Sequence, residues 1–114
     1  MTLQHIAQLL NARVVARPDK LYREVTYAFA SDLMSDVLTV ESRKIILITG
    51  LANIQAVRTA EMSDVSCIIL VRNKKATSEM IRLAEESAIV IMEFEGSMFK
   101  ASGILYNAGI QPIY

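Results

Sequence analysis

Short aliphatic runs alternate with longer, helix-like stretches along most of this chain. Three of the runs consist mainly of Ile, Val, Leu and Met, and they lie at residues 45–48, 66–71 and 89–92. Runs of this length, bounded by polar or glycine residues, are typical of strands buried on both faces of a parallel sheet. The pattern therefore predicts three buried strands, with the run at 45–48 as the central one.

Stretches with apolar residues at helical spacing separate these strands. Asn53 stands before the first stretch as an N-cap, and Thr77 or Ser78 stands before the second. Helices between consecutive buried strands indicate crossover connections in a parallel sheet. We therefore predict a small three-layer α/β domain, with a mostly parallel central sheet flanked by helices and a single domain over residues 1–114.

Five further elements have shorter patterns, and each is bounded by a capping or turn residue. They are a helix at 2–10, strands at 13–16 and 25–30, a short helix from Ser31-Asp32 through Leu38, and a helix after Ser97 that stops at Gly109 and Pro112. Asp32 is assigned first as a cap of the short helix. The alternative is that its side chain points into a cleft at the strand ends.

The carboxyl ends of the predicted strands are the expected place for a binding site. In open α/β sheets, ligands collect beyond these ends. The chain places polar residues at each of them, which predicts a ligand-binding cleft. Its candidate residues are Asp32, Thr49, Gly50, Asn53, Gln55, Arg72, Asn73 and Glu93.

Two of these features have alternative interpretations. Thr49-Gly50 either presents backbone N–H groups to a phosphate at the start of the following helix or forms only a tight turn. The run of cations that begins at Arg72 either neutralises an anionic ligand or lies in a solvated loop. If the cleft assignment is correct, we expect Thr49→Arg to impair ligand binding while the fold stays mostly intact.

No catalytic arrangement is recognisable, and we expect no enzyme activity and no cofactor. Glu93 and Glu95 alternate along an extended segment, so their side chains are expected on opposite sides. His5 has no nearby carboxylate or serine partner, and the single Cys67 is expected in the core with an inert thiol. The phosphate-loop pattern Gly-x4-Gly-Lys-Ser/Thr is absent.

The balance of charges argues against nucleic acid as a partner. Twelve Lys and Arg balance twelve Asp and Glu, whereas nucleic-acid binding needs a net basic surface. No stretch approaches the eighteen or so apolar residues of a membrane span, and the N-terminus lacks the layout of a signal peptide. We therefore expect a cytoplasmic protein without nucleic-acid or membrane partners.

The apolar content predicts self-association. Hydrophobic residues make up 53% of the chain, yet 114 residues provide a limited interior. We expect apolar side chains to face outward at residues 33–38 or at 110–114. A homodimer is the commonest way to cover such a patch.

Several blocks of the chain resemble the DRTGG domain family. They are Asp32-Leu-Met-Ser35 with Val37-Leu38, Leu47-Ile-Thr-Gly50, Asn53-Ile-Gln55, Ile68-Ile-Leu70, Ala84-Glu85 and the strand at Ile89. This family resembles the N-terminal domain of HPr kinase/phosphorylase. Its domains also occur as accessory or regulatory parts of phosphate acetyltransferases and nucleotide-regulated pyrophosphatases. The resemblance implies a compact α/β fold, commonly dimeric, with no catalytic activity of its own.

The chain departs from the family at the residues of its signature. Ala52-Asn53 stands where Asp-Arg is expected, and Val71-Arg72-Asn73 stands where Thr-Gly-Gly is expected. Two functions therefore stay open. One is a non-catalytic regulatory or ligand-sensing module that binds a nucleotide or another phosphorylated, anionic metabolite. The other is a protein-interaction or scaffold subunit of a metabolic or redox enzyme, with a degenerate cleft.

Overall fold

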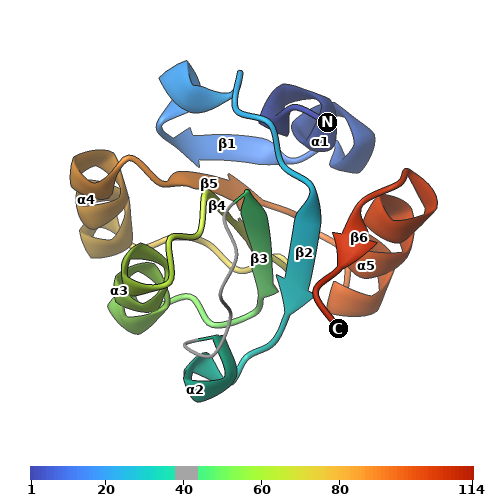
Figure 1. Ribbon diagram of the computed structural model, residues 1–114. Coiled ribbons are helices and arrows are strands. Elements are labelled where there is room, and N and C mark those ends of the chain that lie inside the picture. Colours follow the sequence, from blue (N-terminus) through green and yellow to red (C-terminus); the bar gives the residue numbers. More distant parts are fainter. Residues whose placement is uncertain (38–43) are drawn as a thin grey trace.

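A central sheet of six strands organises the described residues, 1–37 and 44–114, of the computed structural model (Figure 1). The strands are β1 (Arg13–Ala16), β2 (Tyr27–Ala30), β3 (Ile45–Thr49), β4 (Cys67–Leu70), β5 (Val90–Glu93) and β6 (Gln111–Pro112). Their order across the sheet is β1-β5-β4-β3-β2-β6. Every neighbouring pair is parallel except β1 with β5, which confirms the predicted, mostly parallel sheet.

Helices cover both faces of this sheet. The helices α1 (Leu3–Leu10) and α5 (Met98–Asn107) lie on one face, to the right in Figure 1. The helices α2 (Met34–Val37), α3 (Ile54–Met62) and α4 (Ser78–Ser87) lie on the other. A 3-10 helix, η1 (Pro18–Lys20), follows β1. The three-layer α/β prediction is therefore confirmed, although Leu38, the expected end of the short helix, lies outside the described residues.

The three aliphatic runs form the most deeply buried strands. Every residue of β3, β4 and β5 is buried. Successive residues of a strand point to opposite faces, so one run supplies two cores. Ile46 and Ile48 pack under α1 and α5, whereas Leu47 packs under the helices of the other face. Burial on both faces explains why these runs show no polar alternation.

Capping residues determine where the longer helices begin. In each case the side chain of the N-cap accepts a hydrogen bond from the backbone N–H three residues later. These caps are Thr2, Asn53, Thr77 and Ser97. The choice left open between Thr77 and Ser78 therefore falls on Thr77, and the capping role of Asn53 is confirmed.

The end of the chain differs from its prediction. We expected residues after Gly109 only to terminate the last helix, but Gln111–Pro112 forms the edge strand β6 beside β2. Proline has no N–H to donate and is tolerated at a sheet edge. A strand of two residues has no periodic pattern, so the sequence offered no signal for it.

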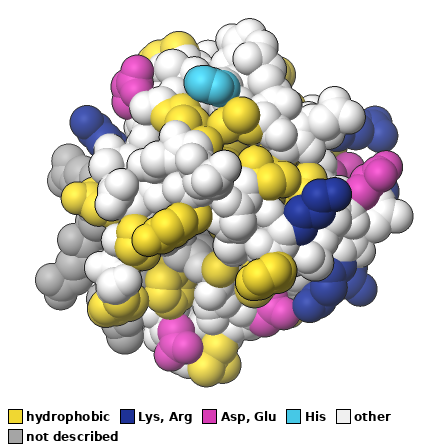
Figure 2. Space-filling model, turned by 90° about the vertical axis from the view of Figure 1, so that its right-hand side faces the viewer, with side chains coloured by type: hydrophobic (Ala, Val, Ile, Leu, Met, Phe, Trp, Pro, Cys, Tyr) yellow, Lys and Arg dark blue, Asp and Glu magenta, His cyan; other side chains and the backbone are white. Residues whose placement is uncertain are grey.

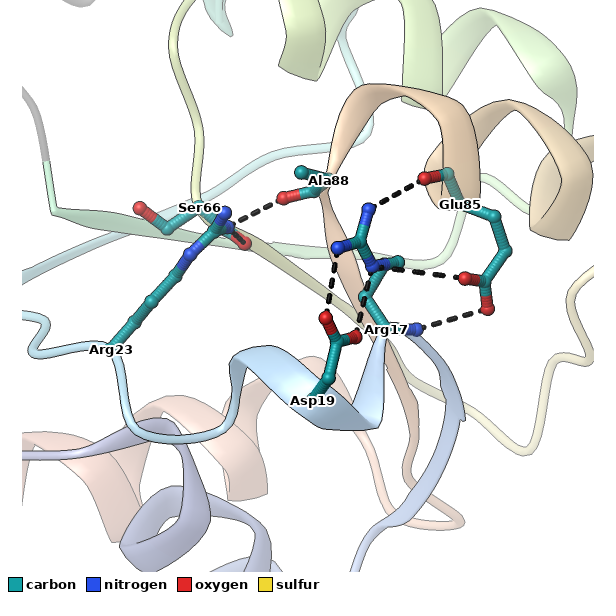
Figure 3. Close-up of polar contacts among 6 residues, drawn as sticks. All are labelled: Arg17, Asp19, Arg23, Ser66, Glu85 and Ala88. Carbon is teal, nitrogen blue, oxygen red and sulfur yellow. Dashed lines mark hydrogen bonds and ion pairs between the residues drawn. The ribbon is translucent and has the colours of Figure 1, made fainter.

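Two arginines hold the C-terminal end of α4 in place (Figure 3). Arg17 donates from Nη1 to the Glu85 carbonyl oxygen at 2.7 Å, and its other two nitrogens donate to the Asp19 carboxylate. These hydrogen bonds hold the pKa of Asp19 at about 2. Arg23 donates to the Ala88 carbonyl oxygen at 2.5 Å and to the Ser66 carbonyl oxygen at 3.4 Å. The last carbonyls of a helix lack intrahelical donors and carry partial negative charge, which a guanidinium satisfies.

Arg23→Gln is expected to destabilise the fold, because the shorter amide cannot reach the carbonyls of Ala88 and Ser66. The free energy of unfolding should fall by about 1–2 kcal/mol, the cost of leaving partly buried acceptors without a charged donor. Urea unfolding measures the difference. Arg82→Gln, which changes an exposed cation on α4, is the control and should stay within about 0.5 kcal/mol of wild type. Equal effects of the two variants would contradict this role of Arg23.

Candidate functional site

The carboxyl ends of β2, β3, β4 and β5 lie along one edge of the sheet. The strand pairing aligns Ala30 with Ile48, Thr49 with Leu70, and Leu70 with Glu93. The segments that follow these strands therefore leave the sheet at nearly the same level. This alignment is what brings several of the predicted site residues together.

Asp32 connects three of these segments. One carboxylate oxygen, Oδ1, accepts hydrogen bonds from the Gly50 N–H at 2.7 Å and from the Thr49 hydroxyl at 3.0 Å. The other, Oδ2, lies 3.4 Å from Nη1 of Arg72. Our first assignment of Asp32, as a helix cap, is therefore wrong, and the alternative of a side chain pointing to the strand ends is correct. The Gly50 N–H lies beyond the end of β3, where a carboxylate makes a short, charge-assisted hydrogen bond to it.

Thr49 is a link in this network and has no solvent exposure. Its hydroxyl donates to Asp32 and accepts a hydrogen bond from the Leu51 N–H at 3.1 Å. Of the pair Thr49-Gly50 that was expected to present N–H groups to a phosphate, Gly50 donates its N–H to Asp32, and the next N–H, that of Leu51, is also bonded within the chain. The expectation that Thr49→Arg would leave the fold mostly intact is wrong, because a charged side chain at a fully buried position is costly.

The Arg72 guanidinium lies directly over Gly50. A Cβ atom added at Gly50 would come within 2.6 Å of Arg72 Cζ, so only glycine lets the guanidinium lie this close to the backbone. Arg72 and Asn73 both have positive φ, 59° and 58°. Their N–H groups donate to the Gly96 and Phe94 carbonyl oxygens at 2.7 and 3.1 Å, which ties this loop to the one after β5.

Glu93 has a positioning role at this edge. Its side chain is buried and accepts a hydrogen bond from the Ala76 N–H at 2.8 Å, with Lys75 Nζ at 3.8 Å. Glu93 therefore anchors the loop between β4 and α4. Gln55 and Asn73 are exposed, and within the described residues neither side chain joins the Asp32 network.

Of the eight predicted site residues, the structure therefore joins Asp32, Thr49, Gly50 and Arg72 in one polar cluster. Asn53 serves as a helix cap and Glu93 as a loop anchor. The pairing of Asp32 with Arg72 has no local sequence signal, because the two residues are 40 positions apart. It depends on the order of the strands.

The electrostatics of the cluster favour an ionised Asp32. The Gly50 N–H contributes most to a lowered pKa of Asp32, and the Thr49 hydroxyl and the Arg72 charge add to it against an opposing effect of burial. The arrangement can hold an anion on a backbone N–H and a guanidinium, and the anion it holds is the chain's own carboxylate. Among the described residues, no group of three or more His, Cys, Asp or Glu side chains is placed to hold a metal ion.

Two further observations concern the thiol of Cys67 and the search for membrane-spanning helices. Cys67 is fully buried, and burial raises the pKa of its thiol, as expected for an inert core residue. No helix within residues 1–37 and 44–114 has the length and apolar character needed to cross a membrane.

Asp32→Asn is expected to lower the free energy of unfolding by about 1 kcal/mol at pH 7. Hydrogen bonds to a charged group are worth more than this, but the half-exposed position weakens the pairing with Arg72. Because folding lowers the pKa of Asp32 below an unfolded value of about 3.9, the ionised carboxylate adds stability above that value. This contribution is lost as the pH falls through the folded-state pKa.

Urea unfolding of wild type and Asp32→Asn between pH 7 and pH 2 should therefore show two stability curves that converge at acid pH. Glu95→Gln, which changes an exposed carboxylate at the same edge, is the matched control. It should differ from wild type by less than about 0.5 kcal/mol throughout. A gap between the Asp32 curves that persists at pH 2 would show that the carboxylate charge is not its cause.

A comparison with solved structures places this fold among known ones. The chain is similar to a crystal structure of the CBS and DRTGG domains of the regulatory region of Clostridium perfringens pyrophosphatase, complexed with the activator diadenosine tetraphosphate. The TM-score is 0.79 with 18% sequence identity. The match covers 98% of this chain and 48% of that one, so the chain spans about half the length of this neighbour.

Comparisons of sequence add no family assignment. No protein-family model matches the chain, and no curated protein matches it. At 18% identity the likeness concerns the fold. The chain therefore has a DRTGG-like α/β fold, similar to part of a regulatory region.

Proposed function

We propose that this chain is a non-catalytic, cytoplasmic regulatory module that senses a nucleotide or another phosphorylated anion at the carboxyl edge of its sheet. One observation carries the proposal. The Asp32 carboxylate rests on the Gly50 N–H and beside the Arg72 guanidinium, and groups of these two kinds bind phosphate in proteins. The regulatory setting of the structural neighbour, which holds a nucleotide activator, supports the same role.

In this proposal Asp32 acts as an internal anion that a ligand replaces. A phosphate that takes over Arg72 and the Gly50 N–H must displace the carboxylate, because the two anions repel each other at one site. Asp32 lies two residues before α2. Its displacement therefore moves the segment leading into that helix, and the ligand favours the displaced state only through its higher affinity for it. This movement is the regulatory output.

The competition predicts opposite effects of two substitutions. Asp32→Asn should bind ATP and diadenosine tetraphosphate about tenfold more tightly than wild type, because it removes about 1.4 kcal/mol of charge competition. Arg72→Gln should bind them more weakly, since it removes the only side-chain cation of the cluster among the described residues. Isothermal titration calorimetry with these two nucleotides and inorganic phosphate measures both effects.

Glu95→Gln again serves as the control and should bind as wild type does. A thermal-shift assay extends the test, because a ligand at a hundredfold excess over its dissociation constant adds about 2.7 kcal/mol of stability. The proposal fails if neither wild type nor Asp32→Asn binds any phosphorylated compound of the panel.

A second function, a protein-interaction subunit of a metabolic or redox enzyme, is favoured by a different surface. Phe99 and Tyr106 on α5 are 89% and 70% exposed, and Tyr114 is 82% exposed. This side of the molecule faces the viewer in Figure 2, where hydrophobic side chains are spread over the middle of the face. Exposed apolar groups gathered on one face of a protein often mark an interface.

We also propose that the protein forms a homodimer. Of the two segments expected to face outward, 33–38 and 110–114, the second is the better candidate, because it lies beside the exposed side chains of α5. In the segment that begins at Leu33, the side chains of Met34 and Val37 are buried, and Leu38 lies outside the described residues. Leu33 alone among the described residues of that segment is a large exposed hydrophobic group. The α5 face therefore offers more apolar surface for a twofold contact.

Light scattering on dilute protein should give twice the mass of one chain. Phe99→Glu should shift the protein to the monomer, because it places a charge in the apolar contact. Tyr22→Glu, at a position 67% exposed and remote from α5 in sequence, should leave the dimer intact. A monomeric wild type would remove the basis for the homodimer.

A further inference from the structure

A hollow of about 260 Å³ lies between β2, α5 and the last residues of the chain. Twelve residues line it, and none of them has a charged side chain. Ile48 and Leu105 are buried at its base, whereas Tyr106 and Tyr114 are largely exposed. Because Ile48 and Thr49 point to opposite faces of the sheet, this hollow and the Asp32 network lie on different sides of it.

Two alanines of β2 create the hollow. Strand pairing sets Ala28 beside Ile46 and Ala30 beside Ile48. On β3 the isoleucines fill the space under α5, whereas the alanines of β2 leave the equivalent space open. Ala28 is partly buried and Ala30 is exposed, so the space that they leave is open to solvent and accessible to a ligand.

The side chains around the hollow suit a flat ring. Tyr106 and Tyr114 contribute aromatic side chains to the lining. Tyr114 is held by an edge-to-face contact with Phe29, at 6.1 Å between ring centroids, and the Phe29 ring itself packs on the other face of the sheet. Aromatic rings prefer such edge-to-face and offset contacts with another ring. Gln111 adds an amide group whose nitrogen donates to the Gly109 carbonyl oxygen at 3.2 Å, so its orientation is held. Apolar walls with a few fixed polar groups are typical of small-molecule sites.

The volume of the hollow and its lack of charged side chains restrict the kind of ligand that it can bind. An apolar cavity of about 150 Å³ holds benzene, and sites for drug-sized ligands start at about 300 Å³. The hollow lies between these sizes, which suits one ring or two fused rings. An ionised group would lose its hydration there without a partner of opposite charge.

We propose that this hollow is a binding site for a flat, uncharged ring system, of the size of an indole or a nucleobase. The site is separate from the anion site at Arg72. Because Tyr106 and Tyr114 also belong to the surface proposed for the homodimer, ring binding and dimerisation are expected to compete. It owes its shape to Ala28 and Ala30 and its affinity to the aromatic side chains around it.

Amide chemical shifts of the full chain, recorded during titration with indole and with adenosine, test the proposal. At least one of these probes should shift the amides of residues 28–30, 102–106 and 110–114 in a saturable way. Ribose 5-phosphate, which carries an anion and no aromatic ring, should leave these amides unchanged. The proposal is overturned if neither ring probe shifts them at millimolar concentration, or if the shifts lie elsewhere.

Two variants locate the site, and two controls separate it from other effects. Ala28→Ile fills the hollow with a better strand former, so binding of the ring probe should be lost while thermal stability does not fall. Tyr106→Ala should weaken binding by about three- to tenfold, whereas Tyr22→Ala, at an exposed tyrosine elsewhere, should not. Arg72→Gln should bind the ring probe as wild type does, so this result is independent of the anion site. Unchanged binding by both Ala28→Ile and Tyr106→Ala would overturn the assignment.

Discussion

Burial of β3, β4 and β5 on both faces is the constraint on which the rest of the structure depends. Strands without a polar face need cover on both sides, and the helices of the two outer layers provide it. Most polar side chains of the described residues then lie at the edges of the sheet, in the loops or on the outer faces of the helices. Chemistry at the sheet must therefore take place at the strand ends, and the Asp32 network lies there.

The Asp32 network shows how such an edge is satisfied without a ligand. The Gly50 N–H, just beyond the end of β3, and the Arg72 guanidinium, after β4, both attract an anion. Asp32, two residues beyond the end of β2, supplies this anion. The glycine at position 50 makes the arrangement feasible, since any side chain there would displace the guanidinium. A site occupied by its own carboxylate is satisfied without a ligand. In our proposal, a ligand with a stronger anion displaces this carboxylate.

Local patterns in the sequence predicted most of the fold. The buried strands and the helix caps depend on neighbouring residues, and both were found where the aliphatic runs and Asn53 or Ser97 indicated them. The two-residue strand β6 was missed because it is held only by its pairing with β2. Asp32 was assigned to the wrong partner first, since a cap is a local interaction and the contact with Gly50 and Arg72 is not. The hollow beside Ala28 could not be predicted from local patterns either. It depends on the strand pairing that sets alanine next to isoleucine.

The state of the Asp32 carboxylate is the most direct test of this account. Selective ¹³C labelling of aspartate and an NMR pH titration measure the pKa of the Asp32 side chain in the full chain. The hydrogen bonds from Gly50 and Thr49 and the charge of Arg72 predict a pKa below the ordinary value of about 3.9. A pKa at or above that value would show that Asp32 is not held as the internal anion of the site.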